Sequence, residues 1–329
     1  MGGDLGPSET VPAAKQALSL LPHLKIILIG SLPIIQPLLT IHQLTDHPRL
    51  QLYHAEQTVE MDERPVIALR EKTQSSMRIM LELVKNNQAD ACVSAGNTGA
   101  LMVMAMRVLG VLPGLKRPAL CTALPTQDGR STIMLDLGAN IDCSPHMLHQ
   151  FAMMGDVVAK HVLNRNKPKI ALLNIGAELI KGSKQVQEAA LLLENDPTIY
   201  YQGFLEGDKI FSGTADVIVA DGFTGNIALK TAEGVARLFY RHFLKANDSD
   251  LDKKTNNQCE KNVSPLSVMH PDLYNGASLL GLHGIVIKSH GRADRRALSN
   301  AILHAVAETE QHLPERISGR FFAEHTHER

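Results

Sequence analysis

The sequence predicts an α/β fold in which helices cover both faces of a mainly parallel, mixed sheet, giving a three-layer α/β/α sandwich. Short apolar segments alternate with helical patterns along the chain, and most of these segments end at a glycine or a small polar residue. Within them apolar residues follow one another, as in IILIG and VIVADG, instead of alternating with polar ones. Such runs are typical of strands buried on both faces.

Seven segments are predicted as strands: residues 25–30, 90–96, 119–126, 131–138, 169–176, 216–222 and 284–291. Residues 50–59 and 198–205 are expected as additional strands, with an antiparallel direction as an option. Seven helices are predicted between the strands: residues 7–21, 75–87, 98–112, 145–164, 184–194, 224–245 and 292–313. Start signals support several of them, such as Pro7 in a first turn and Ser144 and Pro145 ahead of an apolar pattern.

Residues 246–263 break this alternation, because they are rich in Asn, Asp and Lys and contain almost no apolar side chains. They predict a polar loop excursion into solvent. No linker rich in Pro, Gly or Ser divides the chain, so we expect residues 1–329 to form a single domain of two intertwined lobes that share one sheet.

The composition excludes several classes of protein. Lys and Arg number 33 and Asp and Glu number 34, so no broad basic surface for nucleic acid is expected. The longest apolar runs fall far short of the roughly 20 residues that a membrane span requires. The four cysteines are widely spaced and mostly lie near apolar runs, which indicates buried thiols in a reducing cytoplasm. The 15 histidines include no H-E-x-x-H, and no metal site is expected.

Loops that follow the predicted strands form the candidate site, because ligands of open parallel sheets bind at the carboxyl ends of strands. These loops are SAGNTGA, LDLGAN, NIGAELIKG, ADGFTGN and IKSHGRAD, and the N-terminal MGGDLGP has the same character. Backbone N–H groups at the starts of helices hold phosphate without a large positive field. Four amides and one lysine at these positions indicate a phosphate and oxyanion site: Asn97, Asn140, Asn174, Asn226 and Lys181.

Neither an activated nucleophile nor a nucleotide cofactor is predicted. The G-x-x-x-x-G-K-[ST] loop, a G-x-G-x-x-G after a strand and the G-x-S-x-G elbow are all missing. Ser94 ends a predicted strand, but no His and Asp can be assigned around it. For any one loop the alternative is that Gly and Asn only turn the chain. Asp4 and Asp221 are equally well explained as caps of turns.

Six motifs occur in order along the chain: MGGDLGP, SAGNTGAL, LDLGAN, NIGAELIKG, DGFTGN and YNGASLLGLHGIVIKSHG. With these motifs the chain resembles the bacterial phosphate acyltransferase (PlsX) family over nearly its whole length. The resemblance implies an isocitrate/isopropylmalate dehydrogenase-like fold, a single catalytic domain and a homodimer. It also implies transfer of a long-chain fatty acyl group from acyl carrier protein to inorganic phosphate, which gives acyl phosphate at the start of phospholipid synthesis.

On this resemblance, Lys181 is expected to carry phosphate or oxyanion charge, and Asn226 is expected to orient substrate at the start of a helix. Contacts with phosphate, thioester or pantetheine are further expected from Asp4, Asn97, Thr98, Asn140, Asn174, Asp221, Thr224, Asn275 and His290. Phosphate is already an ionised nucleophile, so the reaction needs positioning and oxyanion stabilisation but no cofactor. A membrane-embedded glycerol-3-phosphate acyltransferase is a further expected partner of this cytoplasmic protein, with peripheral membrane contact as an option.

Three features differ from the family pattern. Family members place a hydrophobic strand before the first motif, so the sheet is expected to be short of a strand beside Asp4. Ala177 stands where the family commonly has an acidic residue, which removes a carboxylate there or moves its role to Glu178. Residues 246–263 are polar where the family segment is often apolar or basic, so membrane docking through them is not expected.

Two other functions stay open. A phosphate acetyl- or butyryltransferase would use acyl-coenzyme A as its donor on the same fold. A non-catalytic partner of acyl carrier protein would bind that protein without forming acyl phosphate. A dehydrogenase is disfavoured, because the arginines and paired aspartates that would bind a hydroxyacid and a metal are not evident.

Overall fold

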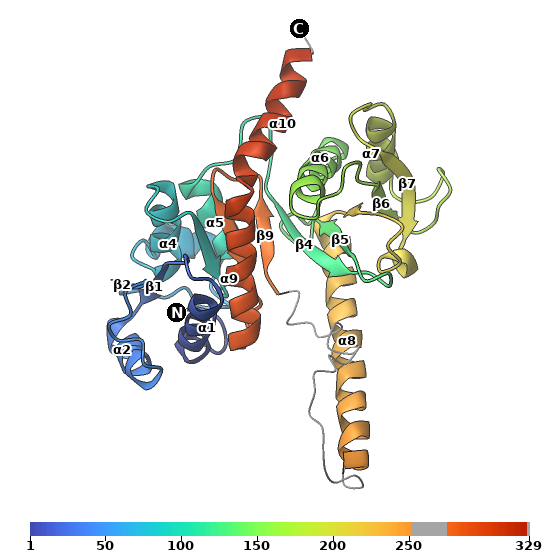
Figure 1. Ribbon diagram of the computed structural model, residues 1–329. Coiled ribbons are helices and arrows are strands. Elements are labelled where there is room, and N and C mark those ends of the chain that lie inside the picture. The colour runs from blue at the N-terminus through green and yellow to red at the C-terminus, as the bar shows by residue number, and fades with distance from the viewer. Residues whose placement is uncertain (252–274, 328–329) are drawn as a thin grey trace.

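The computed structural model describes residues 1–251 and 275–327, which form two sheets with helices around them (Figure 1). The strands are β1 (Ile26–Gly30), β2 (Leu50–His54), β3 (Ala91–Ser94), β4 (Ala119–Pro125), β5 (Ser131–Leu135), β6 (Ile170–Asn174), β7 (Tyr201–Glu206), β8 (Val217–Val219), β9 (Ala277–Leu280) and β10 (Ile285–Lys288). The α-helices are α1 (Pro7–Leu20), α2 (Leu32–Ile41), α3 (Pro65–Glu71), α4 (Ser76–Lys85), α5 (Thr98–Val108), α6 (Pro145–His161), α7 (Lys184–Glu194), α8 (Gly222–Leu251), α9 (Arg295–Glu310) and α10 (Leu313–His327).

Eight strands form one mixed sheet in the order β3-β10-β9-β4-β5-β8-β6-β7. β3 and β10 are parallel at one end, and β5, β8, β6 and β7 are parallel at the other. Between these sets, β10 with β9, β9 with β4 and β4 with β5 are antiparallel pairs. The two parallel sets therefore run in opposite directions, and their carboxyl ends lie at opposite edges of the sheet. The predicted α/β fold with a mainly parallel, mixed sheet is confirmed.

β1 and β2 pair with each other in parallel and form a separate two-stranded sheet. A cavity of about 640 Å³ lies between β1 and β3, and residues of α1, α4 and α9 also line it. Within the described ranges, the facing edges of β1 and β3 pair with no other strand. The sheet is thus interrupted where the sequence predicts it to be short of a strand.

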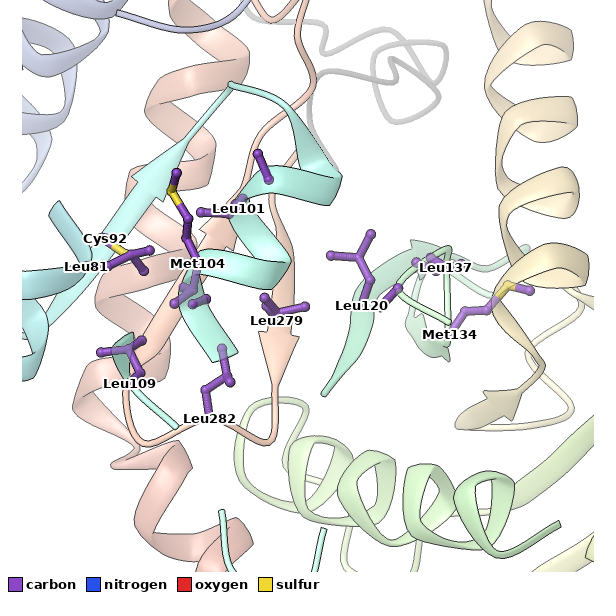
Figure 2. Packing of buried hydrophobic residues seen from close by; sticks show 14 of the residues in the cluster. Leu81, Cys92, Leu101, Met104, Leu109, Leu120, Met134, Leu137, Leu279 and Leu282 are labelled. Atoms are coloured by element: carbon purple, nitrogen blue, oxygen red, sulfur yellow. The ribbon is translucent and has the colours of Figure 1, made fainter. Parts of the chain in front are cut away.

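One hydrophobic core extends through both parallel sets (Figure 2). It includes Leu101 and Met104 of α5, Leu279 of β9, Leu120 of β4 and Met134 of β5. Each of these side chains is at most 8% exposed, and burying a side chain of this size contributes roughly 1.5–3 kcal/mol. Because β9 and β4 carry the core across the antiparallel middle of the sheet, packing as well as hydrogen bonding joins its two ends.

The sequence does not predict β9, α2, α3 or α10. β9 is only four residues long, and α2 contains Pro37, a residue that usually ends a helix. The predicted strands at 50–59 and 198–205 exist as β2 and β7, but both pair in parallel with their neighbours. β2 is largely exposed, β7 is partly exposed, and both lie at the edge of their sheets, a position that does not decide the direction of pairing.

The predicted loop at residues 246–263 begins too early. α8 runs to Leu251, so residues 246–251 are helical, and residues 252–263 lie outside the described residues. Polar composition alone does not end a helix, and no Gly or Pro interrupts the chain between residues 235 and 251.

Within residues 1–251 and 275–327, no helix combines the length and the hydropathy needed to cross a membrane. Cys92, Cys121 and Cys143 are buried free thiols, as predicted, and Cys259 lies outside the described residues.

Candidate active site

Asp136 organises the loop that follows β5. Its side chain is fully buried and accepts hydrogen bonds from the backbone N–H groups of Leu120 (2.9 Å), Ala139 (3.0 Å) and Asn140 (2.7 Å). Burial raises the pKa of Asp136, and these hydrogen bonds act in the opposite direction. Asp136 is not among the residues predicted from the sequence, although an aspartate that directly follows a buried strand in LDLGAN is a signal for it.

The Asn140 side chain supports the same loop. Its amide nitrogen donates to the carbonyl of Pro118 (2.8 Å) and to Asp136 (2.9 Å), while its oxygen accepts from Nε of Arg117 (2.5 Å). Asn140 is only 4% exposed. Its polar atoms are therefore used inside the protein, and contact with substrate stays a prediction.

Asp221 and Thr224 close the start of α8. The Asp221 carboxylate accepts from the backbone N–H and from the hydroxyl of Thr224, both at 2.8 Å. This is the capping arrangement that the sequence offers as the alternative to a binding role for Asp221. The cap fixes the direction in which α8 leaves the sheet.

Asn226 lies where α8 packs on the loop after β5. The backbone of Gly225 approaches the carbonyl of Asp136 so closely that a Cβ at this position would overlap the oxygen. Asn226 itself is exposed, and its side chain lies against Gly138. This amide is thus open to a ligand beside a loop rich in backbone N–H groups.

Lys181 and Asn174 belong to the loop after β6, at the same sheet edge as Asn226. Nδ2 of Asn174 donates to the carbonyl of Lys181 (3.2 Å), and Gly182 turns the chain with φ of 87°. The Lys181 side chain is exposed. The Lys181 ammonium lies at the predicted edge of the sheet. In the described part of the chain it forms no hydrogen bond or ion pair with the other predicted site residues.

Asn97 and Thr98 follow β3, at the opposite edge of the sheet. Oδ1 of Asn97 accepts from the N–H of Ala100 (3.0 Å) and so caps α5. Its Nδ2 donates to three backbone carbonyls between residues 60 and 63, at 2.9 to 3.3 Å. Asn97 is thereby committed to holding the loop, whereas Thr98 at the first turn of α5 is exposed.

Asp4 is held by the loop after β10. Its backbone N–H donates to the carbonyl of Gly291 (2.7 Å), and its carboxylate accepts from Nε of Arg292 (3.1 Å). A Cβ at Gly3, where φ is 88°, would lie 3.0 Å from the side chain of Ala95. The N-terminal segment is therefore fitted between the loops after β3 and β10, and Asp4 pairs with an arginine.

Asn275 braces the turn that carries His290. Its Nδ2 donates to Oγ of Ser289 (2.7 Å) and to the carbonyl of Ala297 (2.8 Å), while its oxygen accepts from the N–H of His290 (2.9 Å). Nδ1 of His290 accepts from the backbone N–H of Arg292 (3.1 Å). The neutral imidazole therefore carries its proton on Nε2, which makes this atom a hydrogen-bond donor.

Lys288, the last residue of β10, is a buried cation that sequence reasoning did not select. It is 8% exposed and stands beside Ser94 in the register of β10 and β3. Its Nζ donates to the carbonyl of Ser289. Burial, and after it the charge of Lys230, lowers the pKa of Lys288 to about 8, while Asp4 acts in the opposite direction. A lysine that ends the apolar run IVIK was the available signal.

Lys230 connects the two groups of loops. It lies one turn beyond Asn226 on α8, is exposed, and forms an ion pair with Glu233 at 3.0 Å. Burial, and after it the charge of Lys230, lowers the pKa of His290. The first turns of α8 therefore pack on the loop after β5 and bring the charge of Lys230 within electrostatic range of Lys288 and His290.

The buried cysteines of the described residues are not suited to nucleophilic catalysis. Burial raises the pKa of Cys92 and of Cys143 to about 12, and that of Cys121 well above its usual value, so none of these thiols is a ready thiolate nucleophile. No cluster of potential metal ligands occurs within residues 1–251 and 275–327. The groups that the candidate site offers to a ligand are cations, side-chain amides and backbone N–H groups.

Solved structures define the class of fold. The EutD phosphotransacetylase from Staphylococcus aureus is similar with a TM-score of 0.60 and 18% identity, covering 92% of each chain. A phosphotransacetylase from Streptococcus pyogenes gives 0.62 and 18%, covering 92% of this chain and 91% of that one. A Salmonella typhimurium protein assigned as a 4-hydroxythreonine-4-phosphate dehydrogenase gives 0.53 and 15%, covering 93% and 97%. The fold is thus the dehydrogenase-like α/β fold that phosphotransacylases share.

Sequence relatives define the family. The model of a family described as "fatty acid synthesis protein" matches residues 1–316. The phosphate acyltransferase of Tolumonas auensis is 68% identical over 329 residues, which is 100% of this chain and 97% of that protein. The phosphate acyltransferase of Aeromonas salmonicida is 54% identical over 322 residues, 97% of this chain and 94% of that protein. The chain belongs to this family, as the motif series predicts, and the protein is an acyltransferase.

Proposed function

We propose that the protein transfers a long-chain fatty acyl group from acyl carrier protein to inorganic phosphate. The product, an acyl phosphate, serves glycerol-3-phosphate acylation in phospholipid synthesis. Membership of a fatty acid synthesis family and the names of its relatives support phosphate as the acceptor. The observation that carries the proposal is the gathering of cationic and amide side chains from α8 and β10 without an ionised thiol in the described residues.

The reaction needs no covalent enzyme intermediate. An oxygen of phosphate attacks the thioester carbon, and the carbonyl electrons move to the oxygen of a tetrahedral intermediate. Collapse of that intermediate breaks the carbon–sulfur bond, so acyl phosphate forms and the thiolate leaves and takes up a proton. Correct positioning of the two reactants supplies about 7–11 kcal/mol of the barrier in well-oriented systems.

Lys181 and Asn226 are the proposed catalytic residues. Both are exposed, Lys181 in the loop after β6 and Asn226 on the helix after β8, where their ammonium and amide groups are open to substrate. A donor aimed at the oxyanion of the intermediate is typically worth about 3–4 kcal/mol. The buried or capped residues of the same loops, Asn140 and Asp221, would hold those loops in place.

The proposal also includes the surroundings of the enzyme. We expect a cytoplasmic homodimer that passes its product to a membrane-embedded glycerol-3-phosphate acyltransferase. Gel filtration with light scattering measures the oligomeric state, and a mass of one chain would contradict the dimer. The acyl donor separates this function from that of an acetyl- or butyryltransferase.

Acyl phosphate formation tests the function directly. Purified protein is mixed with phosphate and either palmitoyl carrier protein or palmitoyl-coenzyme A at equal concentration, and the product is trapped with hydroxylamine. We expect turnover with the carrier protein to exceed turnover with coenzyme A. Preference for coenzyme A would contradict the donor, and binding of carrier protein without any product would indicate a non-catalytic partner.

A double variant tests the catalytic residues. We expect Lys181→Ala with Asn226→Ala to lower kcat by about 100-fold or more while the protein keeps its fold by circular dichroism. Asp142→Ala is the control, because Asp142 is exposed in the segment between the loop after β5 and α6. Normal turnover in the double variant would contradict the assignment.

A further inference from the structure

We propose that Lys288, assisted by His290 and Lys230, holds the inorganic phosphate that accepts the acyl group. This inference rests on the proposed function and names the residues that bind one of its two substrates. It assigns a role to Lys288 and Lys230 and leaves Lys181 and Asn226 to the thioester and its oxyanion.

The first argument is the missing partner of Lys288. An ammonium that is 8% exposed requires compensation, because a buried charge is normally paired. In residues 1–251 and 275–327 no carboxylate lies within 4 Å of its Nζ, which donates only to the carbonyl of Ser289. Asp4 is the nearby carboxylate, but Arg292 already binds it. An anionic ligand would supply the missing charge.

The second argument is the excess of positive charge around this position. The cationic side chains near Lys288, His290 and Asp4 are Lys230, Arg237 and Arg292. The carboxylates are Asp4 and Glu233, and Glu233 is shared between Lys230 (3.0 Å) and Arg237 (3.6 Å). With Lys288 itself, four cations face two carboxylates. Such an excess of positive charge favours a phosphate dianion.

The third argument is the orientation of His290. Nδ1 accepts from the N–H of Arg292, so Nε2 of the neutral ring is a donor. The backbone N–H of His290 is held by Asn275, which also binds Ser289 and Ala297. The turn after β10 is therefore rigidly braced, and it presents a neutral donor close to a buried ammonium. A neutral donor beside a cation suits an oxyanion better than a second, repelling cation would.

The fourth argument is the position of Lys230. α8 carries Asn226 beside the loop after β5 and, one turn later, Lys230, whose charge acts on both Lys288 and His290. Phosphate bound between Lys288 and Lys230 would lie one helical turn from the proposed oxyanion residue. A turn of helix spans about 5.4 Å, which is the scale of a phosphate and the adjoining thioester carbon.

Equilibrium binding of orthophosphate tests the inference without any acyl donor. Isothermal titration compares the wild type with Lys288→Met, Lys230→Met and Lys209→Met. Lys209 is the matched control, since it is an exposed lysine paired with Glu206 at 3.7 Å beyond β7. We expect Lys288→Met to weaken orthophosphate binding about tenfold or more, Lys230→Met to weaken it less, and Lys209→Met to leave it unchanged.

Kinetics provide a readout that a purely structural role would not move. The KM for phosphate should rise about tenfold or more in Lys288→Met, while the KM for the acyl donor stays within about twofold. Titration with 4′-phosphopantetheine distinguishes a phosphate on the donor from free phosphate. Orthophosphate binding that is equal in wild type and Lys288→Met, or a loss confined to 4′-phosphopantetheine, would overturn the inference. Orthophosphate binding is measured without acyl transfer. A protein that forms no acyl phosphate could therefore still bind orthophosphate through Lys288, and an active enzyme could still bind it elsewhere.

Discussion

The loops at the two edges of the sheet use buried charge in opposite ways. After β5, the Asp136 carboxylate is surrounded by N–H donors, and the neighbouring Asn140 completes its hydrogen bonding. After β10, the Lys288 side chain is also buried, at 8% exposed, but its ammonium finds only one neighbouring carbonyl. A satisfied buried charge holds backbone in place, whereas an unsatisfied one is costly and requires an explanation in function.

The largest effect is expected at Asp136. Asp136→Ala leaves several buried N–H groups without an acceptor, each at a cost of about 1–3 kcal/mol, so we expect a loss of roughly 3–5 kcal/mol in the free energy of unfolding. Urea denaturation followed by circular dichroism measures it. Asp142→Ala, an exposed aspartate a few residues on, should change stability by less than about 0.5 kcal/mol. Equal losses of stability in Asp136→Ala and Asp142→Ala would contradict the claim that the Asp136 hydrogen bonds hold the loop.

Lys288 is expected to respond in the opposite direction. A pKa of about 8 in place of 10.5 means that keeping the ammonium buried at neutral pH costs roughly 3 kcal/mol. Lys288→Met retains most of the stem without the charge, so we expect it to be more stable than the wild type by up to about that amount while binding phosphate poorly.

The stability difference between the wild type and Lys288→Met should depend on pH. Between pH 8 and 10.5 the unfolded chain binds more protons at Lys288 than the folded protein does. Wild-type stability, taken relative to Lys288→Met, should therefore rise through that window and be lowest below pH 8. Urea denaturation of both proteins at pH 7 and pH 10 measures the difference. A variant that is less stable than the wild type at both values would mean that Lys288 stabilises the fold.

Two glycines of α8 differ in the space around them, and replacing each by alanine should change stability in opposite directions. A Cβ at Gly225 would overlap the Asp136 carbonyl, so Gly225→Ala should destabilise the protein by about 1–3 kcal/mol. A Cβ at Gly234 would meet no atom within 4 Å, so Gly234→Ala should stabilise the helix by about 0.5–1 kcal/mol. Thermal denaturation of both variants checks the opposite signs, and two changes of the same sign would contradict the close contact.

A small effect is also expected at the cap of α8. Asp221→Ala should cost about 1 kcal/mol by removing the acceptor for Thr224, with little change in the KM for phosphate. Asp221→Asn keeps an acceptor and should recover most of that stability. A large rise in the KM for phosphate in both variants would show that Asp221 binds substrate as well as capping the helix.

The sequence predicts where most buried strands end, because apolar runs define them, and the loops that follow them remain the predicted site. It does not predict that the parallel pair β3 and β10 runs opposite to the parallel strands β5, β8, β6 and β7. That reversal depends on β9, whose four residues of ASLL follow the turn-like YNG and give little periodic signal. The position of a polar residue after a strand is readable from a sequence, but the edge of the sheet to which it belongs depends on long-range pairing.

The roles of individual side chains were less accessible to the sequence. Asn97 and Asn275 look like ligands for phosphate in the sequence, yet in the fold their amides bind neighbouring backbone. In the sequence Lys288 is only the last residue of a strand. Its burial without a neighbouring carboxylate, which indicates an anion site, is visible only in the fold. Burial and partner choice depend on segments far apart in the chain, such as Asp4 and α8, and no local pattern reports them.

The pKa of Lys288 tests the central claim most directly. Nuclear magnetic resonance of the protein labelled with 13C at lysine Cε follows this group through a pH titration, with Lys288→Met to assign its signal. Lys230, Asp4 and His290 are the charged or titratable groups beside it. We predict a pKa of about 8 without ligand and a clear rise at saturating orthophosphate, because the bound anion favours the ammonium form. A pKa that stays the same with and without orthophosphate would contradict the claim that Lys288 holds the phosphate.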